Sequence, residues 1–138
     1  QPQPKFVIFA HHATYDTLHQ VATLGLTAAA MGKDVIVILL FWTIKKLAEG
    51  KIDQVDFPPE YAASADEVTR LLKEKKVPKI SEMFQDAKHV GAFRLIACSA
   101  GLEYMGVDGA VVEKNVDEVM GLPAIIALTS DAETKLFI

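Results

Sequence analysis

The fold is decided by the stretch Val35-Ile36-Val37-Ile38-Leu39-Leu40-Phe41, which Trp42 extends to eight uninterrupted apolar residues. Its β-branched residues are typical of a strand, and the lack of alternation between apolar and polar positions indicates that both faces are buried. A membrane-spanning helix would need about 20 apolar residues, so a buried strand is the better interpretation. Strands of this kind occur in parallel sheets flanked by helices, which predicts an α/β protein.

Helical and strand-like segments alternate through the rest of the chain. Their order implies right-handed crossovers and a three-layer α/β/α sandwich. Periodicity does not decide between strand and helix for residues 122–128. The expected strands are 5–10, 35–41, 92–97, 116–119 and 135–138, and the expected helices are 14–31, 43–49, 64–75, 81–90, 99–105 and 108–114.

Two boundaries carry a local signal. Ser64 and Glu67 stand at capping-box spacing, which predicts that a charged surface helix begins at Ser64. Cys98 is expected to be the first residue after the third strand, with a helix N-terminus directly behind it.

Composition narrows the class of protein. The 138 residues fit a single domain, 1–138, and a hydrophobic fraction of 51% is high enough that we expect part of the apolar surface to lie between subunits of a homo-oligomer. The net charge of −4 without a basic stripe argues against a nucleic-acid partner. No membrane-spanning segment is expected.

The cysteine count indicates a compartment. One cysteine excludes an internal disulfide and a zinc site with several thiolates, and a single free thiol fits the reducing cytoplasm. The start, Gln1-Pro2-Gln3-Pro4, is neither a signal peptide nor a Met start, so we expect a trimmed or processed N-terminus.

Chemistry-bearing residues follow the first three expected strands. Open parallel sheets bind ligands at the carboxyl ends of their strands, so these residues would meet in one cleft if the three strands are neighbours. They are His11 and His12, then Trp42 and Thr43, then Cys98 and Ser99.

Cys98 has the sharpest placement of these residues. Backbone N–H groups and the dipole of the following helix would lower the pKa of its thiol and favour the nucleophilic thiolate. The alternative is a buried thiol that packs as a small hydrophobe.

The other candidates each have a structural alternative. His11 or His12 could accept a proton or stabilise a thiolate, although adjacent strand residues point to opposite faces and only one of them should face the cleft. Trp42 could line the pocket or anchor a subunit contact, Thr43 belongs to the same strand end, and Ser99 could bond a sulfur species or cap a helix. Phosphate-binding loops, the Gly-x-Ser-x-Gly elbow and Cys-x-x-Cys are absent from the sequence.

Four segments resemble the DsrE/DsrF-like proteins, in particular their peroxiredoxin-like subgroup. One of them is Ala28-Ala29-Ala30-Met31-Gly32-Lys33-Asp34-Val35, a helix end that runs into the second strand. The best match is Leu95-Ile96-Ala97-Cys98-Ser99 with Glu103-Tyr104-Met105-Gly106-Val107 behind it. The end of the 35–41 strand with Phe41-Trp42 and Lys45 is similar to the family's Phe-Trp segment, and Lys135-Leu136-Phe137-Ile138 is similar to its last strand.

The resemblance implies a five-stranded parallel sheet between helices, with residues 122–128 as a helix. It also implies oligomers that handle sulfur as a cysteine persulfide, and it carries the functional cysteine over to Cys98. The helix after Cys98 lacks the family's usual methionines, and no second cysteine could resolve an internal disulfide.

These observations leave three hypotheses. The first is a sulfur carrier or sulfurtransferase that needs no cofactor and no metal, loads sulfane sulfur on Cys98, and exchanges it with donor and acceptor proteins or small thiols. The second is a non-catalytic oligomeric module that binds a small ligand or a protein and contains an inert cysteine. The third is a metal or redox sensor that uses Cys98 and a histidine.

Overall fold

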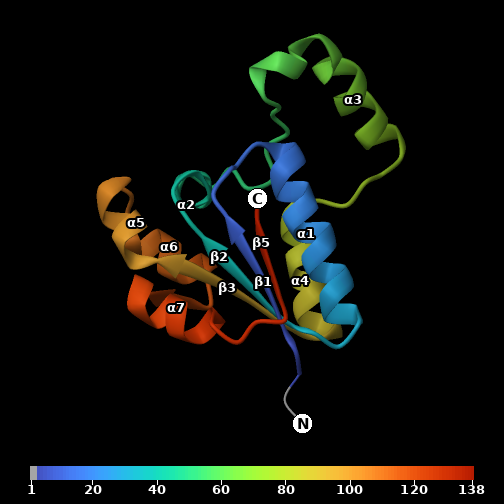
Figure 1. Ribbon diagram of the computed structural model, residues 1–138. Coiled ribbons are helices and arrows are strands. Elements are labelled where there is room, and N and C mark those ends of the chain that lie inside the picture. The colour runs from blue at the N-terminus through green and yellow to red at the C-terminus, as the bar shows by residue number, and fades with distance from the viewer. Residues whose placement is uncertain (1–2) are drawn as a thin grey trace.

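The computed structural model describes residues 3–138, which form a five-stranded parallel sheet in the order β4-β3-β2-β1-β5 with helices on both faces (Figure 1). The strands are β1 (Lys5–Ala10), β2 (Asp34–Leu39), β3 (Ala92–Cys98), β4 (Glu118–Met120) and β5 (Thr134–Phe137). The helices are α1 (Tyr15–Ala30), α2 (Trp42–Ala48), the 3-10 helix η1 (Pro59–Tyr61), α3 (Ala62–Glu74), α4 (Ile80–Val90), α5 (Ser99–Tyr104), α6 (Gly109–Asn115) and α7 (Leu122–Thr129).

Strand β2 lies at the centre of the sheet, as its apolar run predicts. Five of its six residues, Val35 to Leu39, are buried, and it pairs in parallel with β1 on one side and β3 on the other. The strand ends at Leu39 rather than Phe41, because the Leu40 N–H bonds to the Ala10 carbonyl at 3.0 Å and Phe41 turns the chain with a φ of 53°. The first three strands are therefore neighbours in the sheet.

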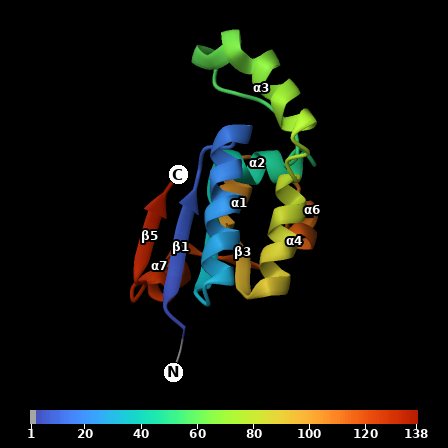
Figure 2. The same ribbon diagram turned by 90° about the vertical axis from the view of Figure 1, so that its right-hand side faces the viewer.

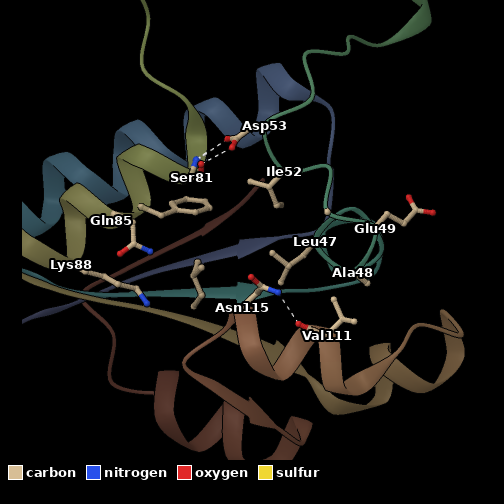
Figure 3. Close-up of a pocket in the computed structure, with 13 residues that line it drawn as sticks. Leu47, Ala48, Glu49, Ile52, Asp53, Ser81, Gln85, Lys88, Val111 and Asn115 are labelled. Carbon is tan, nitrogen blue, oxygen red and sulfur yellow. Dashed lines mark hydrogen bonds between the residues drawn. The ribbon is translucent and has the colours of Figure 1, made fainter.

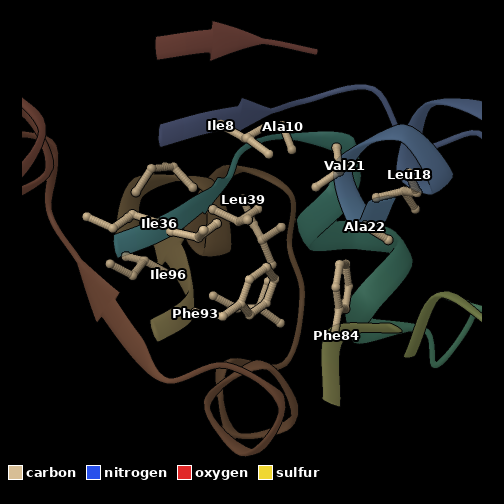
Figure 4. Packing of buried hydrophobic residues seen from close by; sticks show 14 of the residues in the cluster. Ile8, Ala10, Leu18, Val21, Ala22, Ile36, Leu39, Phe84, Phe93 and Ile96 are labelled. Atoms are coloured by element: carbon tan, nitrogen blue, oxygen red, sulfur yellow. The ribbon is translucent and has the colours of Figure 1, made fainter. Parts of the chain in front are cut away.

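Helices α1 and α4 cover one face of the sheet (Figure 2). They approach it closely because Gly25 of α1 lies against the ring of Phe93, where a Cβ would be only 2.7 Å from the ring. Phe84 of α4 stacks on the same ring with 5.6 Å between centroids, and Figure 4 shows these rings beside the aliphatic core. Each fully buried aliphatic side chain in this layer contributes about 1.5–3 kcal/mol to folding.

Helix α7 lies over the opposite face of the sheet (Figure 1). Ile125 is its buried anchor at 1% exposure, and the Lys5 ammonium donates to the Leu128 carbonyl at 2.7 Å. Residues 122–128, which periodicity left open, are thus helical, as the family resemblance implies. The sequence-based expectation of an α/β/α sandwich around a parallel sheet is confirmed.

Besides the end of β2, three other predicted boundaries differ clearly from the observed ones. Helix α3 begins at Ala62 and follows the turn of η1, so Ser64 lies within the helix and does not cap it. Strand β4 begins at Glu118, two residues after the expected start, and Cys98 is the last residue of β3 rather than the first one past it.

Helix α3 projects away from the sheet in both views (Figures 1 and 2). None of its residues is buried. In residues 3–138, none of the helices combines the length and the apolar character needed to cross a membrane.

Candidate functional site

Cys98 occupies the carboxyl end of β3, an interior strand of the sheet. It pairs with Met120 of the neighbouring strand β4. Its backbone is extended, and α5 begins at the next residue, Ser99. The side chain is a free thiol, and the residue is only 1% exposed. The position agrees with the expectation of a strand end, whereas the burial agrees with the alternative of a packed thiol.

The thiol points to the α7 side of the sheet. Side chains alternate along a strand, and Phe93 faces α1 through its contact with Gly25. Leu95 therefore also faces the α1 and α4 side, whereas Cys98, three residues further along, faces the opposite side. The thiol and the α1–α4 layer are separated by the sheet.

Helix α5 is short, and its contacts with the rest of the chain include those of Gly101, Leu102 and Tyr104. Gly101 is buried against Ile44, where a Cβ would lie 2.5 Å from the Ile44 Cδ1 atom, and Tyr104 rests on Phe41 with 5.4 Å between ring centroids. Helix α5 has six residues, one fewer than the expected range 99–105.

An exposed aromatic cluster marks the carboxyl end of β2. Phe41, Trp42 and Tyr104 are 42%, 51% and 58% exposed, and the Phe41 and Trp42 rings meet at 5.2 Å. Phe41 has φ 53° and ψ −109°, a conformation that costs a non-glycine residue about 1–3 kcal/mol. This strained turn directs Phe41 towards Tyr104 of α5, and no local sequence signal marks it.

A cleft opens at the carboxyl ends of β1 and β2, and we call it the His12 cleft. Its cavity volume is about 490 Å³, and its walls include His12, Trp42 and the prolines Pro58 and Pro59. Of the six residues expected to share one cleft, the structure brings His12 and Trp42 together here. Cys98 does not line it, so the expectation that all three strand ends meet in one cleft is wrong for Cys98.

An ion pair between buried Lys46 and partly exposed Asp56 supports this cleft. Lys46 is 7% exposed, and its ammonium donates to the Ala13 carbonyl at 2.7 Å and to the Asp56 carboxylate at 2.8 Å. The same carboxylate oxygen accepts the Tyr15 N–H at 2.8 Å, at the start of α1. Sequence analysis missed this pair because Asp56 lies in an irregular segment whose path no periodicity predicts.

The two histidines do not contact Cys98. Their backbone N–H groups both bond to the Ile138 carbonyl, at 2.9 Å for His11 and 3.4 Å for His12, and their rings pack edge to face at 4.2 Å. The His11 Nδ1 atom is buried without a partner among the described residues. Because β2 separates β1 from β3, no hydrogen bond joins either imidazole to the thiol in residues 3–138.

Thr43 and Ser99 have structural positions that differ from the expected ones. Thr43 is fully buried, and its hydroxyl donates to the Ala10 carbonyl at 2.8 Å and accepts the Leu40 N–H at 3.0 Å, so it ties the ends of β1 and β2 together. Ser99 is exposed and is the first residue of α5 rather than its cap.

Two electrostatic features complete this end of the sheet. Burial, with a smaller effect of the Asp53 charge, raises the pKa of Tyr15. A hydrogen bond from Lys45 lowers the pKa of Glu49, which is also on the wall of the His12 cleft. In residues 3–138, no three histidine, cysteine or carboxylate side chains are grouped as metal ligands would be.

The fold is shared with solved structures of very different sequence. A conserved protein of unknown function, BT1422 from Bacteroides thetaiotaomicron, has a TM-score of 0.61 at 18% identity, with 98% of this chain and 95% of that chain covered.

Two further structures are similar over nearly the whole chain. The ychN protein from E. coli has a TM-score of 0.58 at 16% identity, covering 99% of this chain and 100% of its own. The protein of unknown function MTH1491 from Methanobacterium thermoautotrophicum has a TM-score of 0.58 at 14% identity, with the same coverage. No protein-family model and no curated protein matches the sequence. The structural neighbours establish that the chain has the DsrE/YchN-like fold.

Proposed function

We propose that this chain is a cytoplasmic sulfur carrier that holds sulfane sulfur as a persulfide on Cys98 and passes it to an acceptor thiol. The observation that carries the proposal is the position of the chain's single cysteine at the carboxyl end of an interior parallel strand. That edge of an α/β sheet is where ligands and reactive groups are usually placed. The sequence resemblance around Cys98 adds support.

The transfer is an exchange between sulfur atoms without net oxidation. The Cys98 thiolate attacks the outer sulfur of a donor persulfide, R–S–SH, and forms a new S–S bond. The donor's S–S bond breaks, and its electron pair leaves with the inner sulfur as the thiolate R–S⁻. An acceptor thiolate then attacks the outer sulfur on Cys98 and restores the Cys98 thiolate. Neither histidine is assigned a role in these steps, since no hydrogen bond links it to the thiol.

The burial of Cys98 sets a condition for this chemistry. At 1% exposure, the thiol can meet a donor only when its surroundings open. Helix α5 is the element whose displacement would uncover the thiol, because it begins at the next residue and has only six residues to hold it in place. Loading is therefore expected to be slower than reaction of a fully exposed thiol.

Copies of this chain are the proposed structural partners, besides the sulfur donor and acceptor. Helix α3 has no buried residue. Helix α7 carries no charged residue and leaves Leu122 and Ile126 48% and 66% exposed. Contacts between copies would bury these faces.

Mass spectrometry of the intact protein after incubation with polysulfide tests the proposal. We expect a sulfur-mass adduct on the wild type that a reducing thiol removes, and no adduct on Cys98→Ser or Cys98→Ala. The alanine variant guards against a folding defect caused by a buried hydroxyl. An adduct on either folded variant, or none on the wild type, contradicts the proposal.

The second candidate is a binding module that uses the His12 cleft, with Cys98 as a packing residue. It is favoured by one contrast, namely that the thiol is buried whereas the cleft of about 490 Å³ is open. Alkylation distinguishes the two candidates. An inert thiol reacts only as fast as the protein unfolds, whereas a carrier thiol reacts faster than global unfolding allows.

A further inference from the structure

A second concave surface lies away from Cys98 and adjoins the His12 cleft at Glu49. It is a groove with a cavity volume of about 430 Å³ between α2, α4 and α6, with β3 at its base (Figure 3). We call it the α4–α6 groove. Its volume lies within the range of pockets that hold small organic molecules.

The floor of the groove is apolar. Its exposed atoms come from aliphatic side chains and one phenyl ring, and the deepest of these residues are only 5–6% exposed. The floor residues are Leu47, Ile52, Phe84, Leu95 and Val111. A floor of this kind favours the flat or compact apolar body of a ligand over a strongly hydrated one.

The charged groups on the rim already form hydrogen bonds or ion pairs within the chain. The Asp53 carboxylate accepts the N–H of Ser81 at 2.9 Å and also its hydroxyl, and the Lys88 ammonium binds Asp117 at 2.7 Å. Glu49 is paired in the same way with Lys45. A charged ligand would have to displace these partners or remain unpaired beside them, which favours an uncharged ligand.

The rim groups that can still form hydrogen bonds to a ligand are two side-chain amides and one ammonium group. Gln85 makes no side-chain hydrogen bond to any described residue, and Figure 3 shows its amide beside the groove, near the side chain of Lys88. The Asn115 Nδ2 group donates to the Val111 carbonyl at 2.8 Å, which leaves its Oδ1 atom as an acceptor. Lys88 has three N–H donors, of which Asp117 takes one.

From these contacts we infer that the α4–α6 groove is a binding site for an uncharged organic molecule with an apolar body and an amide or carbonyl edge. The apolar body lies on the floor near Leu95, and the edge bonds to Gln85, Lys88 and the Asn115 Oδ1 atom. The site is independent of sulfur chemistry, because Leu95 and Cys98 point to opposite faces of β3.

Methyl-resolved NMR titration with benzamide tests this inference. Benzamide presents a phenyl ring and an uncharged amide, and a molecule of this size should bind with a dissociation constant of about 1 mM. We expect saturable shifts at the methyl groups of Leu47, Ile52, Leu95 and Val111. Benzoate and benzylamine, which carry a charge on the same ring, should bind at least about 10-fold more weakly.

Variants separate the groove from other surfaces. Gln85→Leu should weaken benzamide binding about 5-fold. Gln20→Leu, an equally exposed glutamine on α1 outside the groove, should leave it unchanged. Cys98→Ala should also leave it unchanged, so this result does not depend on whether Cys98 carries sulfur.

Three outcomes overturn the inference. One is the absence of saturable methyl shifts up to about 10 mM benzamide. Another is a set of shifts centred on the His12 cleft instead of the groove. The third is equal binding of benzamide and its charged analogues.

Discussion

Placing a bulky side chain at position 101 should open the region around Cys98. A Cβ at Gly101 would lie 2.5 Å from the Ile44 Cδ1 atom, about 1 Å closer than an ordinary contact. Ile44 is fully buried, so Gly101→Val crowds the α2–α5 contact inside the core. Such overpacking costs about 1–3 kcal/mol, and the better helix propensity of valine offsets only about 0.4 kcal/mol of it.

The free-energy cost of Gly101→Val should appear as local opening of α5, because this helix is short and begins beside Cys98. A penalty of about 1–3 kcal/mol raises the open population roughly 5- to 150-fold. The alkylation rate of Cys98 by iodoacetamide under native conditions, followed by mass spectrometry, should rise by the same factor. A denaturant titration run alongside gives the global stability.

Gly109→Val is the matched control. Nothing lies within 4 Å of a Cβ at that position, which is the first residue of α6. We expect its alkylation rate to equal that of the wild type. The reasoning is refuted if Gly101→Val alkylates no faster than the control, or if its acceleration is no larger than its loss of global stability alone would produce.

Three further predictions concern stability. Gly91→Ala should cost at least about 1–3 kcal/mol in a denaturant titration, because its Cβ would lie 2.4 Å from the Ala29 carbonyl oxygen; a smaller loss would show that α1 can shift. Lys46→Met should cost about 1–3 kcal/mol because it leaves Asp56 and two carbonyls without their donor; an unchanged melting temperature would contradict this role of the ion pair. Tyr15, whose pKa burial raises, holds its proton more tightly in the folded state, so its stabilising contribution is full below pH 10.0 and is lost as the pH rises through the folded value. Stability should therefore fall less steeply above pH 10.0 in Tyr15→Phe, and equal slopes would contradict the prediction.

The centre of the fold could be predicted from the sequence because its signals are local. The unbroken apolar run of β2 reflects burial on both faces, and helical periodicity with glycine stops outlines α1 and α4. The apolar segment 122–128 was ambiguous for a physical reason. It is too uniformly hydrophobic to show a period, and only the family resemblance indicated the helix.

The candidate site could be predicted less well because its geometry depends on contacts across the chain. The sequence left open whether β1, β2 and β3 are neighbours, and the structure shows that they are. The direction of each side chain at a strand end depends on the final residue of the strand. Strand β3 extends one residue further than expected and includes Cys98. The direction of the thiol is therefore set by the alternation of side chains along that strand. No local sequence pattern predicts the strained turn at Phe41 or the Lys46–Asp56 pair.

The geometry also determines which sites can influence one another. The α4–α6 groove and the His12 cleft share Glu49 at the end of α2 as a common wall. A ligand in the groove can therefore act on the cleft through a single helix end. Influence on Cys98 must instead cross the sheet from the Leu95 side or pass from α2 to α5 through the contact of Ile44 with Gly101. Since that contact is the one that Gly101→Val disrupts, a ligand effect on Cys98 alkylation that disappears in this variant would locate the coupling at α2 and α5.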